Sequence, residues 1–485
     1  MKTFDLVVVG SGSGLLVLEE GIKAGWSCAL VENDKIGGTC LNRGCIPSKV
    51  LIEPATFIRE AERAARIGIK PPPPQLDWEI LSRRLWARIN RNKIMEKNLA
   101  ETSNLTLFRG RGEFTGERRM RVHLNGDAGF SEEFEGKRFV LATGSRTMVP
   151  PIPGLEETGY VTSESFFGDR YPAKPWPSLT IIGGGIIASE FAHVFSAFGT
   201  RVTVAEMLPR LLSTEEPEVS EHVLRAFRRR LDVRLNARAA AVRTEAGRKV
   251  VAVEDTKTGE RSEITADEIL IAVGRRSNAD VLAADKTGVR TDRGGWIAAD
   301  EFLETNVPGI WAIGDALGKF QFRHKANADA DAVIRNIFGP AGQKAAVDLS
   351  AVPWAVFTDP EVGHVGMTEG EAVEAGHKVM VAVQHYSEIA KGYAMGFEPG
   401  DGDDGFAKIV ADTKGRILGA HVVGPQAALL LQPFVYMMKA GTFCPDAGTI
   451  RPIAEAMVIH PSLNELTGWA VWNFKPASIL RRQTT

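Results

Sequence analysis

Two segments of the chain, about 170 residues apart, repeat the same local pattern. Each starts with a short apolar stretch typical of a buried strand, passes through a glycine-rich turn into a helical pattern, and ends in a second strand closed by an acidic residue. The first copy comprises Asp5–Val9, Gly10-Ser11-Gly12-Ser13-Gly14, a helix to Ala24, and Ser27–Val31 with Glu32. The second comprises Ser178–Ile182, Gly183-Gly184-Gly185, a helix to Phe198, and Arg201–Ala205 with Glu206. The repeat predicts a chain built around two Rossmann-like α/β units.

The turns and the acidic residues of both copies suit a dinucleotide. Glycine lets the backbone approach a pyrophosphate, which the free N–H groups of the following helix attract. Glu32 and Glu206 follow their first glycines by 22 and 23 positions, where a carboxylate accepts hydrogen bonds from ribose hydroxyls. A carboxylate repels a 2′-phosphate, so Glu206 favours NAD over NADP. Two bound dinucleotides would imply an electron relay. Structural turns without a ligand are the alternative, and Leu15 at the third glycine position of the first copy departs from the pattern.

The composition is that of an ordinary folded protein without a preference for polyanions. Lys and Arg number 58 against 60 Asp and Glu among 485 residues, so neither a nucleic-acid nor an anionic-membrane partner is expected. The apolar stretch 179–199 contains Glu190, His193 and a triple-glycine break, which argues against a membrane span. Four cysteines are too few for a disulfide-stapled secreted fold, and the N-terminus does not match a signal peptide. We therefore expect a cytoplasmic protein, with about three domains for this length.

Cys40 and Cys45 lie five positions apart in the block 37–49, GGTCLNRGCIPSK. In a regular helix that spacing separates residues by about 7.5 Å along the axis, beyond the usual Cα separation in a disulfide. A bond between them would need a distorted turn, for which Gly44 supplies backbone freedom, and a strained disulfide is readily reduced. Two inert thiols and a metal site are the alternatives. A metal site would need further soft ligands, which the neighbouring sequence, Cys28 and Cys444 do not offer, so no metal is expected.

The cysteine block resembles the redox motif of the FAD-dependent pyridine nucleotide-disulfide oxidoreductases. Further blocks follow along the chain in the order that this family shows: Leu141–Arg146, Val273–Asn278, Thr305–Asp315, Phe357–Gly363 and His460–Glu465. The resemblance implies a glutathione reductase-like fold, α/β with two Rossmann-like nucleotide-binding domains and a C-terminal α+β dimerisation domain. It assigns residues 1–153 and 274–349 to the FAD-binding domain, 154–273 to the NAD-binding domain, and 350–485 to the dimerisation domain.

The resemblance also implies which residues hold the two cofactors. The FAD contacts that it assigns are Gly10, Gly12, Gly14, Glu32, Thr39, Lys49, Gly112, Thr143, Gly144, Ser145, Asp315 and Ala326. In this set Asp315 would meet a ribityl hydroxyl, Ala326 would offer its backbone to the flavin ring, and Gly112 would offer its backbone to the adenine. The NAD contacts that it assigns are Gly183, Gly185, Ala188, Glu190, Glu206 and Gly274.

A disulfide relay follows from the same resemblance. Electrons would pass from NADH through FAD to the Cys40–Cys45 disulfide, leaving Cys45 as a thiolate against the flavin and Cys40 as the thiol that exchanges with substrate. Lys49 would lie beneath the flavin with Glu190 as its partner, unless the two form an ordinary surface ion pair. His460, oriented by Glu465, would move protons during thiol exchange. In this family that histidine comes from the other subunit, so activity implies a homodimer.

Within the family, Ile186 and Glu206 favour an NAD-linked dihydrolipoamide dehydrogenase acting on a small or carrier-bound dithiol. Leu15 and Val458 depart from typical members of that group. The alternatives are a low-molecular-weight disulfide reductase resembling mycothione reductase, and a redox flavoprotein that serves as a binding module of a multienzyme complex.

Three smaller expectations concern the remaining segments. Residues 60–66 and 81–99 predict two helices joined by the stiff run 71–74. The basic run 228–230 is expected on a solvated face. Trp469 and Trp472 are expected either in a dimer contact or in the core.

Overall fold

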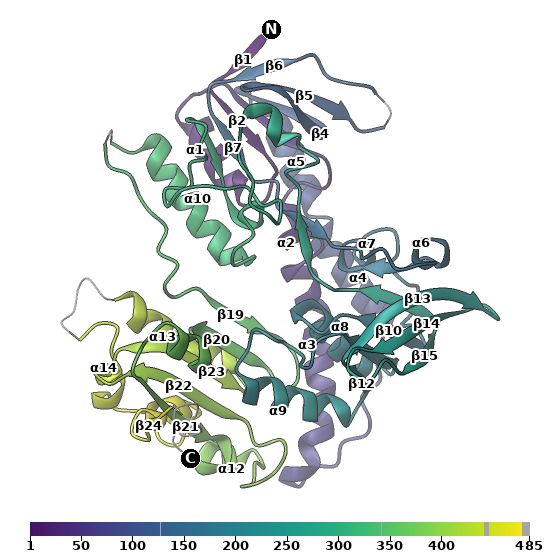
Figure 1. Ribbon diagram of the computed structural model, residues 1–485, viewed down its shortest axis with the longest axis vertical. Coiled ribbons are helices and arrows are strands. Elements are labelled where there is room, and N and C mark those ends of the chain that lie inside the picture. Colours follow the sequence, from purple (N-terminus) through teal and green to yellow (C-terminus); the bar gives the residue numbers. More distant parts are fainter. Residues whose placement is uncertain (127, 341, 441–445, 478–485) are drawn as a thin grey trace.

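The computed structural model describes residues 1–126, 128–340, 342–440 and 446–477 (Figure 1). Cys444 and residues 478–485 of the expected dimerisation domain therefore lie outside the described residues. The described residues form two sheets with parallel cores, a third large sheet near the C-terminus, and two small antiparallel sheets, with the N-terminus at the top of Figure 1.

The first sheet has eight strands in the order β1-β6-β5-β4-β3-β2-β7-β18. Its core is a run of five parallel strands, β4-β3-β2-β7-β18, and the antiparallel β5 and β6 extend it. The strands are β1 (Lys2–Phe4), β2 (Leu6–Val9), β3 (Cys28–Glu32), β4 (Leu105–Gly116), β5 (Arg119–Leu124), β6 (Phe134–Gly136), β7 (Phe139–Leu141) and β18 (Ile310–Ala312). Helices α1 (Gly14–Lys23) and α10 (Arg323–Phe338) pack against each other beside it.

The second sheet repeats this parallel core. Its five strands run in the order β12-β11-β10-β16-β9, all parallel, and β10 occupies the central place that β2 holds in the first sheet. The bounds are β9 (Val161–Thr162), β10 (Ser178–Ile182), β11 (Arg201–Glu206), β12 (Asp232–Leu235) and β16 (Glu268–Ile271), with α8 (Ile186–Ala197) and α9 (Pro217–Arg228). An antiparallel meander of β13 (Ala237–Glu245), β14 (Arg248–Asp255) and β15 (Arg261–Ala266) accompanies it. The predicted pair of Rossmann-like units is confirmed.

Short elements connect the two units. The strands β8 (Ser145–Thr147) and β17 (Arg275–Ser277) pair antiparallel where the chain passes from one unit to the other and back. The helices α6 (Leu155–Thr158) and α7 (Ser163–Phe166) follow the first crossing.

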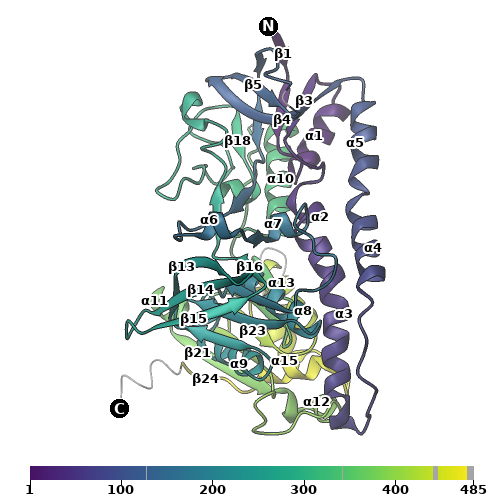
Figure 2. The ribbon, with the colours of Figure 1, turned by 90° about the vertical axis from the view of Figure 1, so that its right-hand side faces the viewer.

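A long helical segment runs beside both units (Figure 2). It consists of α2 (Gly38–Asn42), α3 (Cys45–Arg63), α4 (Trp78–Ile89) and α5 (Asn92–Ala100), and α3 packs against both α4 and α8. The expected single helix over 81–99 is wrong, because Asn90 ends α4 and α5 starts at Asn92. The apolar periodicity continues across this break, so the sequence pattern did not reveal it.

The C-terminal sheet has six strands in the order β19-β20-β23-β22-β21-β24, and its neighbouring strands are antiparallel. They are β19 (Pro353–Val356), β20 (Val362–Gly366), β21 (Val379–His385), β22 (Phe406–Asp412), β23 (Ile417–Val423) and β24 (Lys475–Pro476). The accompanying helices are α11 (Glu369–Glu374), α12 (Ala390–Ala394), α13 (Ala427–Lys439), α14 (Arg451–Glu455) and α15 (Asn464–Ala470). This agrees with the expected α+β character of the segment.

The apolar core continues between the second unit and the C-terminal sheet. One cluster joins Phe195 and Val223 of the second unit to Val362 and Phe406 of the C-terminal sheet. The expectation of a solvated face over 228–230 is wrong for Arg230, whose Nη1 lies 2.7 Å from Oδ2 of the largely buried Asp359. Because that carboxylate comes from a loop 129 residues away, sequence alone gave no sign of the pair.

None of the described helices is both long and apolar enough to cross a membrane.

Candidate active site

The first glycine of each turn is held in a conformation that other residues rarely adopt. Gly10 has φ +100° and Gly183 has φ +116°. A Cβ atom on Gly10 would lie 2.2 Å from the carbonyl oxygen of Ala142, and one on Gly183 would lie 2.3 Å from that of Ala272. The two turns therefore pack on the neighbouring strand in the same way, and glycine is required at both positions.

The glycine at the third position of each turn, Gly12 or Gly185, faces open space. A Cβ atom on Gly12 or on Gly185 would meet nothing within 4 Å. Gly12 precedes α1, which starts at Gly14, and Gly185 directly precedes α8. The free N–H groups of these helix starts and the room beside the backbone fit the diphosphate of a dinucleotide.

The acidic residue at the end of the second strand is buried and already oriented in both units. Glu32 Oε2 accepts hydrogen bonds from the N–H and Oγ of Ser11, at 2.9 and 2.6 Å. Glu206 Oε1 accepts from the N–H of Leu208 at 2.7 Å, and burial raises the pKa of its carboxyl group. Each carboxylate thus lies beside its own glycine turn, where a ribose would follow the diphosphate.

The Leu15 departure is explained by packing. The Leu15 side chain contacts the apolar cluster between the first sheet and its helices, which includes Val8 and Leu30. The side chain is therefore directed into the core, and the turn at Gly10 and Gly12 keeps its shape.

A polar network connects Ser145 and Asp315, two of the expected FAD contacts, with Arg275. Ser145 Oγ donates to Asp315 Oδ2 at 2.8 Å and accepts from Arg275 Nε at 2.6 Å. Arg275 had no role in the sequence analysis, because its contact with Ser145 depends on the β8–β17 pairing. Among the described residues, the buried Thr143 Oγ1 has no hydrogen-bond partner, as expected where a ligand supplies one.

The remaining expected cofactor residues lie around these two turns. Ala326 on α10 packs against Gly314, which directly precedes Asp315. Gly112 lies on β4, three positions beyond the residue that pairs with Glu32. The residues Gly144 and Gly274 follow β7 and β16, the strands next to β2 and β10, and Ala188 is buried in the first turn of α8.

The cysteine block interrupts its helix between the two sulfurs. Cys40 lies in α2, the chain leaves helical geometry at Arg43 and Gly44, and Cys45 is the first residue of α3. Thr39 closes α2 by accepting a hydrogen bond from the N–H of Arg43 at 2.9 Å. A Cβ atom on Gly38 would lie 2.7 Å from the Cα of Gly12, so the block is packed directly on the first glycine turn. The distorted turn that a bond between the cysteines would need is present.

The two thiols differ in acidity. Both are free in the structure, and a hydrogen bond from Cys40 is the main influence that lowers the pKa of Cys45 from 9.0 to about 7. Burial opposes this decrease, and the positive charge of Lys49 adds to it. The same hydrogen bond is the main cause that raises the pKa of Cys40, and burial adds to it. The start of the 19-residue helix α3 also favours a thiolate at Cys45. The pair is therefore arranged as a Cys45 thiolate that accepts a hydrogen bond from the Cys40 thiol.

Lys49 lies one turn beyond Cys45 and joins α3 to α8. Its Nζ lies 2.8 and 2.9 Å from the two carboxylate oxygens of Glu190. Phe357 supports the pair from the C-terminal segment, because its N–H donates to Glu190 Oε1 at 3.1 Å and its ring lies 4.3 Å from Lys49 Nζ. Sequence analysis gave Phe357 no role, since no spacing connects it to either residue.

A cleft of about 840 Å³ opens onto Cys45 and Lys49. Its lining is largely apolar, with a few charged side chains: Cys45, Ile46, Lys49, Val50, Glu53, Pro54, Phe57, Arg84 and Phe357.

His460 and Glu465 form a second arrangement on the C-terminal segment. His460 Nδ1 makes a short contact with Glu465 Oε1, and the glutamate side chain is fully buried whereas the histidine side chain is 65% exposed. Neither residue lines the cleft at Cys45. Large apolar side chains beside the histidine are also exposed: Met457 and Ile459, its near neighbours in the chain, and Trp469, which stacks on its ring. A single chain therefore presents an oriented imidazole on an apolar surface.

The fold and this site define a flavin-linked disulfide oxidoreductase, and the chain belongs to the pyridine nucleotide-disulphide oxidoreductase family, class I. Residues 4–330 match the family's nucleotide-binding sequence profile, and residues 352–471 match its dimerisation domain. Proteins of this family bind FAD and NAD(P), which confirms the two expected dinucleotide cofactors. The dimerisation domain supports the expected homodimer.

The similar proteins carry different names within that family. Mycothione reductase of Mycobacterium tuberculosis is 33% identical over 473 residues, covering 96% of this chain and 98% of the relative. Dihydrolipoyl dehydrogenase 3 of Haloarcula marismortui is 33% identical over 487 residues, covering 99% and 98%. Among solved structures, the Cu(II) complex of the HOCl-induced flavoprotein disulfide reductase RclA from Escherichia coli has a TM-score of 0.82 and 28% identity, covering 97% of this chain and 99% of that one.

Proposed function

We propose that the protein is an NAD-linked oxidoreductase that exchanges electrons with a dithiol or disulfide through Cys40 and Cys45. The observation that carries this proposal is the unequal thiol pair at the start of α3, beside the Lys49–Glu190 ion pair. FAD, when bound, supplies the two-electron link between the nicotinamide and the cysteine pair. The glycine turn at Gly10 and Gly12, with Glu32 and Asp315, would hold it.

In this proposal, different residues of the chain have different roles in the thiol chemistry. Cys40, kept as a thiol at neutral pH, becomes the exchanging nucleophile when a base takes its proton. His460 of the partner subunit is proposed as that base, with Glu465 fixing its ring. The exposed apolar side chains around His460 support a contact with a second copy at this surface. Lys49 stabilises negative charge beside Cys45.

Dihydrolipoamide is the proposed substrate. The apolar lining contributed by Ile46, Val50, Pro54 and Phe57 suits a hydrocarbon dithiol. NAD is the proposed nucleotide, because the buried Glu206 carboxylate is expected where a 2′-phosphate would bind. Arg210, four positions beyond Glu206, instead contacts the carbonyl of Ser213. A lipoyl carrier protein as physiological donor, and a cytoplasmic location, stay predictions.

Mycothiol disulfide is the second candidate. A mycothione reductase and a dihydrolipoyl dehydrogenase are equally identical to this chain, and Leu15 and Val458 depart from typical dihydrolipoamide dehydrogenases.

Steady-state kinetics of the FAD-loaded enzyme decide between these substrates. We expect NAD⁺ reduction with dihydrolipoamide, and much weaker turnover with the disulfides of mycothiol, glutathione and coenzyme A or with NADPH. Rapid NADPH oxidation with another disulfide, without turnover of dihydrolipoamide, would contradict both the substrate and the nucleotide. Absence of turnover with every member of this panel would favour the binding-module alternative.

A further inference from the structure

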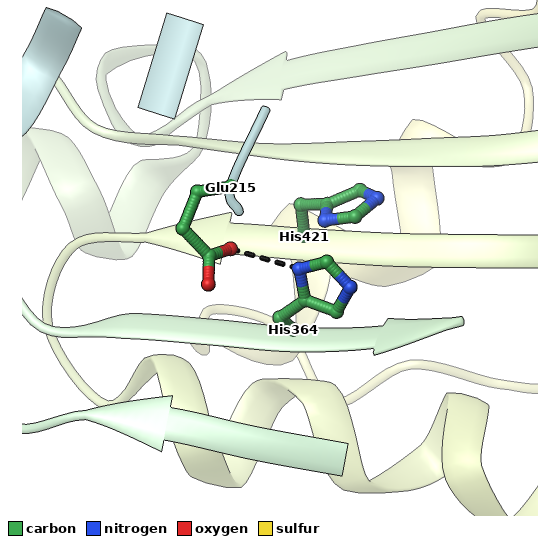
Figure 3. Close-up of side chains that lie close together, drawn as sticks. All are labelled: Glu215, His364 and His421. Atoms are coloured by element: carbon green, nitrogen blue, oxygen red, sulfur yellow. Dashed lines mark hydrogen bonds and ion pairs between the residues drawn. The ribbon is translucent and has the colours of Figure 1, made fainter. Parts of the chain in front are cut away.

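Three side chains that do not line the redox cleft meet in the interior between the second nucleotide unit and the C-terminal sheet (Figure 3). His364 on β20 and His421 on β23 are directly opposite each other in an antiparallel ladder, so both point to the same face of the sheet. Glu215 reaches them from the loop before α9. All three side chains are at most 1% exposed.

Hydrogen bonds to the backbone determine where the imidazole lone pairs lie. His364 Nε2 lies 3.0 Å from the carbonyl oxygen of Gly366, and His421 Nε2 lies 3.1 Å from that of Met367. A carbonyl only accepts, so each Nε2 carries a hydrogen, and Nδ1 is the ring nitrogen left to bind a proton or a metal ion.

The Nδ1 atoms of the two rings differ in their partners. His364 Nδ1 lies 2.8 Å from Glu215 Oε2, a contact that either a shared proton or a metal ion can bridge. The fully buried His421 Nδ1 has no hydrogen-bond partner among the described residues. An unpaired buried acceptor costs about 1–3 kcal/mol, which a bound cation would remove.

The surroundings already hold these groups in the arrangement of metal ligands. Metal-binding histidines generally donate their second ring N–H to a carbonyl or carboxylate, as both rings do here. Trp354 Nε1 donates to the other oxygen of Glu215 at 2.6 Å, and its ring stacks on His364 with centroids 3.6 Å apart. One ligand atom from each of the three residues lies within 4.8 Å of the others, close enough for one ion at about 2.1 Å from each after small side-chain shifts.

The buried carboxylates around this cluster also favour binding of a divalent cation. Lys408 is 3% exposed, and its Nζ lies 3.0 Å from Glu216 and 2.8 Å from Glu369. Two buried carboxylates therefore share the ammonium group of Lys408, and a third buried carboxylate, Glu215, is the chain neighbour of Glu216. A divalent ion bound to Glu215 would add positive charge beside these buried carboxylates.

We propose that Glu215, His364 and His421 form a binding site for one divalent transition-metal ion that joins the second nucleotide unit to the C-terminal sheet. Two imidazole nitrogens and a carboxylate oxygen suit Zn²⁺ and Cu²⁺, and the order of divalent affinities favours the same ions over Mn²⁺ or Fe²⁺. On binding, the ion displaces the proton shared by His364 and Glu215 into solvent. Sequence analysis expected no metal because it considered only a site at the cysteine pair. It could not point to this site, whose ligands lie 149 and 57 positions apart. None of them lines the redox cleft.

Metal content of the full-length holoenzyme tests the site. Cys40→Ser and Cys45→Ser are included as a background so that thiolates do not bind the ion, and the protein is expressed in zinc-supplemented medium because the site is buried. We expect about one zinc per chain, and at least a tenfold loss with His421→Gln or Glu215→Gln. His385→Gln is the matched control, since His385 lies at the end of β21 in the same sheet but outside the cluster. Zinc content equal in His421→Gln and in the background protein would overturn the proposal.

A second measurement needs no ligand substitution, in case the variants do not fold. The background protein expressed with Cu²⁺ is examined by electron paramagnetic resonance. Coupling of the copper to two imidazole nitrogens supports the site. A spectrum without nitrogen coupling, or no bound copper, overturns it.

Discussion

At the scale of single residues, the redox site depends on an asymmetry between two identical side chains. Cys40 donates a hydrogen bond and has a raised pKa, whereas Cys45 accepts it, lies at a helix start and has a lowered pKa. A thiolate at Cys45 and a thiol at Cys40 are the forms that the proposed relay needs after two-electron reduction.

Replacing Cys40 by alanine tests this asymmetry, because it removes the donor that contributes most to the lowered pKa of Cys45. The Cys45 thiolate then forms only at higher pH, with a midpoint that moves from about 7 toward 9.0. At pH 7 the thiolate fraction falls by about tenfold or more. The ultraviolet absorbance of the thiolate across a pH titration measures this, with Cys40→Ala/Cys45→Ser as the control for Cys28. An unchanged midpoint would show that Cys40 does not set the acidity of Cys45.

Lys49 and Glu190 should shift the same titration in opposite directions. Lys49 lowers the pKa of Cys45 and Glu190 raises it. Lys49→Gln is therefore expected to move the thiolate midpoint upward, and Glu190→Gln to move it downward, by a fraction of the Cys40→Ala effect. Both variants keep a polar group of similar length. Shifts of the same sign would disprove the electrostatic role assigned to the pair.

The sequence predicted the cysteines, the glycines, both acidic residues, and the residues of the Lys49–Glu190 and His460–Glu465 pairs, because each belongs to a local motif. It did not reveal Phe357 or Arg275 as parts of the site. Their contacts cross from one sheet or segment to another, at separations of more than 100 residues. Only the fold brings such residues together.

At the scale of elements, the two strand–turn–helix units have the same turn geometry. In both, the first glycine, Gly10 or Gly183, packs on a carbonyl oxygen at the end of the neighbouring strand. The glycine two positions later, Gly12 or Gly185, faces open space. The sequence predicted these elements almost to the residue, since turn chemistry and strand periodicity act locally. It missed the end of α4 at Asn90, where neither glycine nor proline marks the break.

Alanine at Gly10 and alanine at Gly12 should impair different properties, the stability of the fold in the first case and FAD binding in the second. Gly10→Ala combines a strained φ of +100° with a contact of 2.2 Å to Ala142, so it should lower the free energy of unfolding by about 1–3 kcal/mol or more. Gly12→Ala should leave stability unchanged but weaken FAD binding at least tenfold, because the methyl group occupies the space beside the turn. Thermal unfolding of the FAD-free protein and FAD titration separate the two effects. Equal FAD affinity of Gly12→Ala and wild type would contradict the assigned phosphate position.

Gly183 and Gly185 provide the matched comparison in the second unit. Gly185→Ala is expected to weaken binding of the nicotinamide nucleotide while FAD stays bound, whereas Gly183→Ala should destabilise the fold.

At the scale of the whole molecule, the proposed thiol-exchange site is complete only if two chains contribute to it. One chain carries the cysteines and the Lys49–Glu190 pair beside the cleft, whereas its own His460 lies outside that cleft on an exposed apolar surface. The sequence identified the dimerisation segment from its motif. It could not place the buried cluster of Glu215, His364 and His421, which forms only where the loop before α9 meets the C-terminal sheet.

Complementation between two inactive variants tests this composite site most directly. In a heterodimer of Cys45→Ser and His460→Gln chains, prepared by co-expression with two affinity tags, one of the two sites combines an intact cysteine pair with an intact His460 from the partner. Each parent homodimer should lose about 100-fold or more of its disulfide exchange activity. The heterodimer should recover about half of the wild-type activity, because one site in two is restored. A heterodimer as inactive as its parents would contradict the proposal that His460 acts across the subunit interface on the cysteines of the partner.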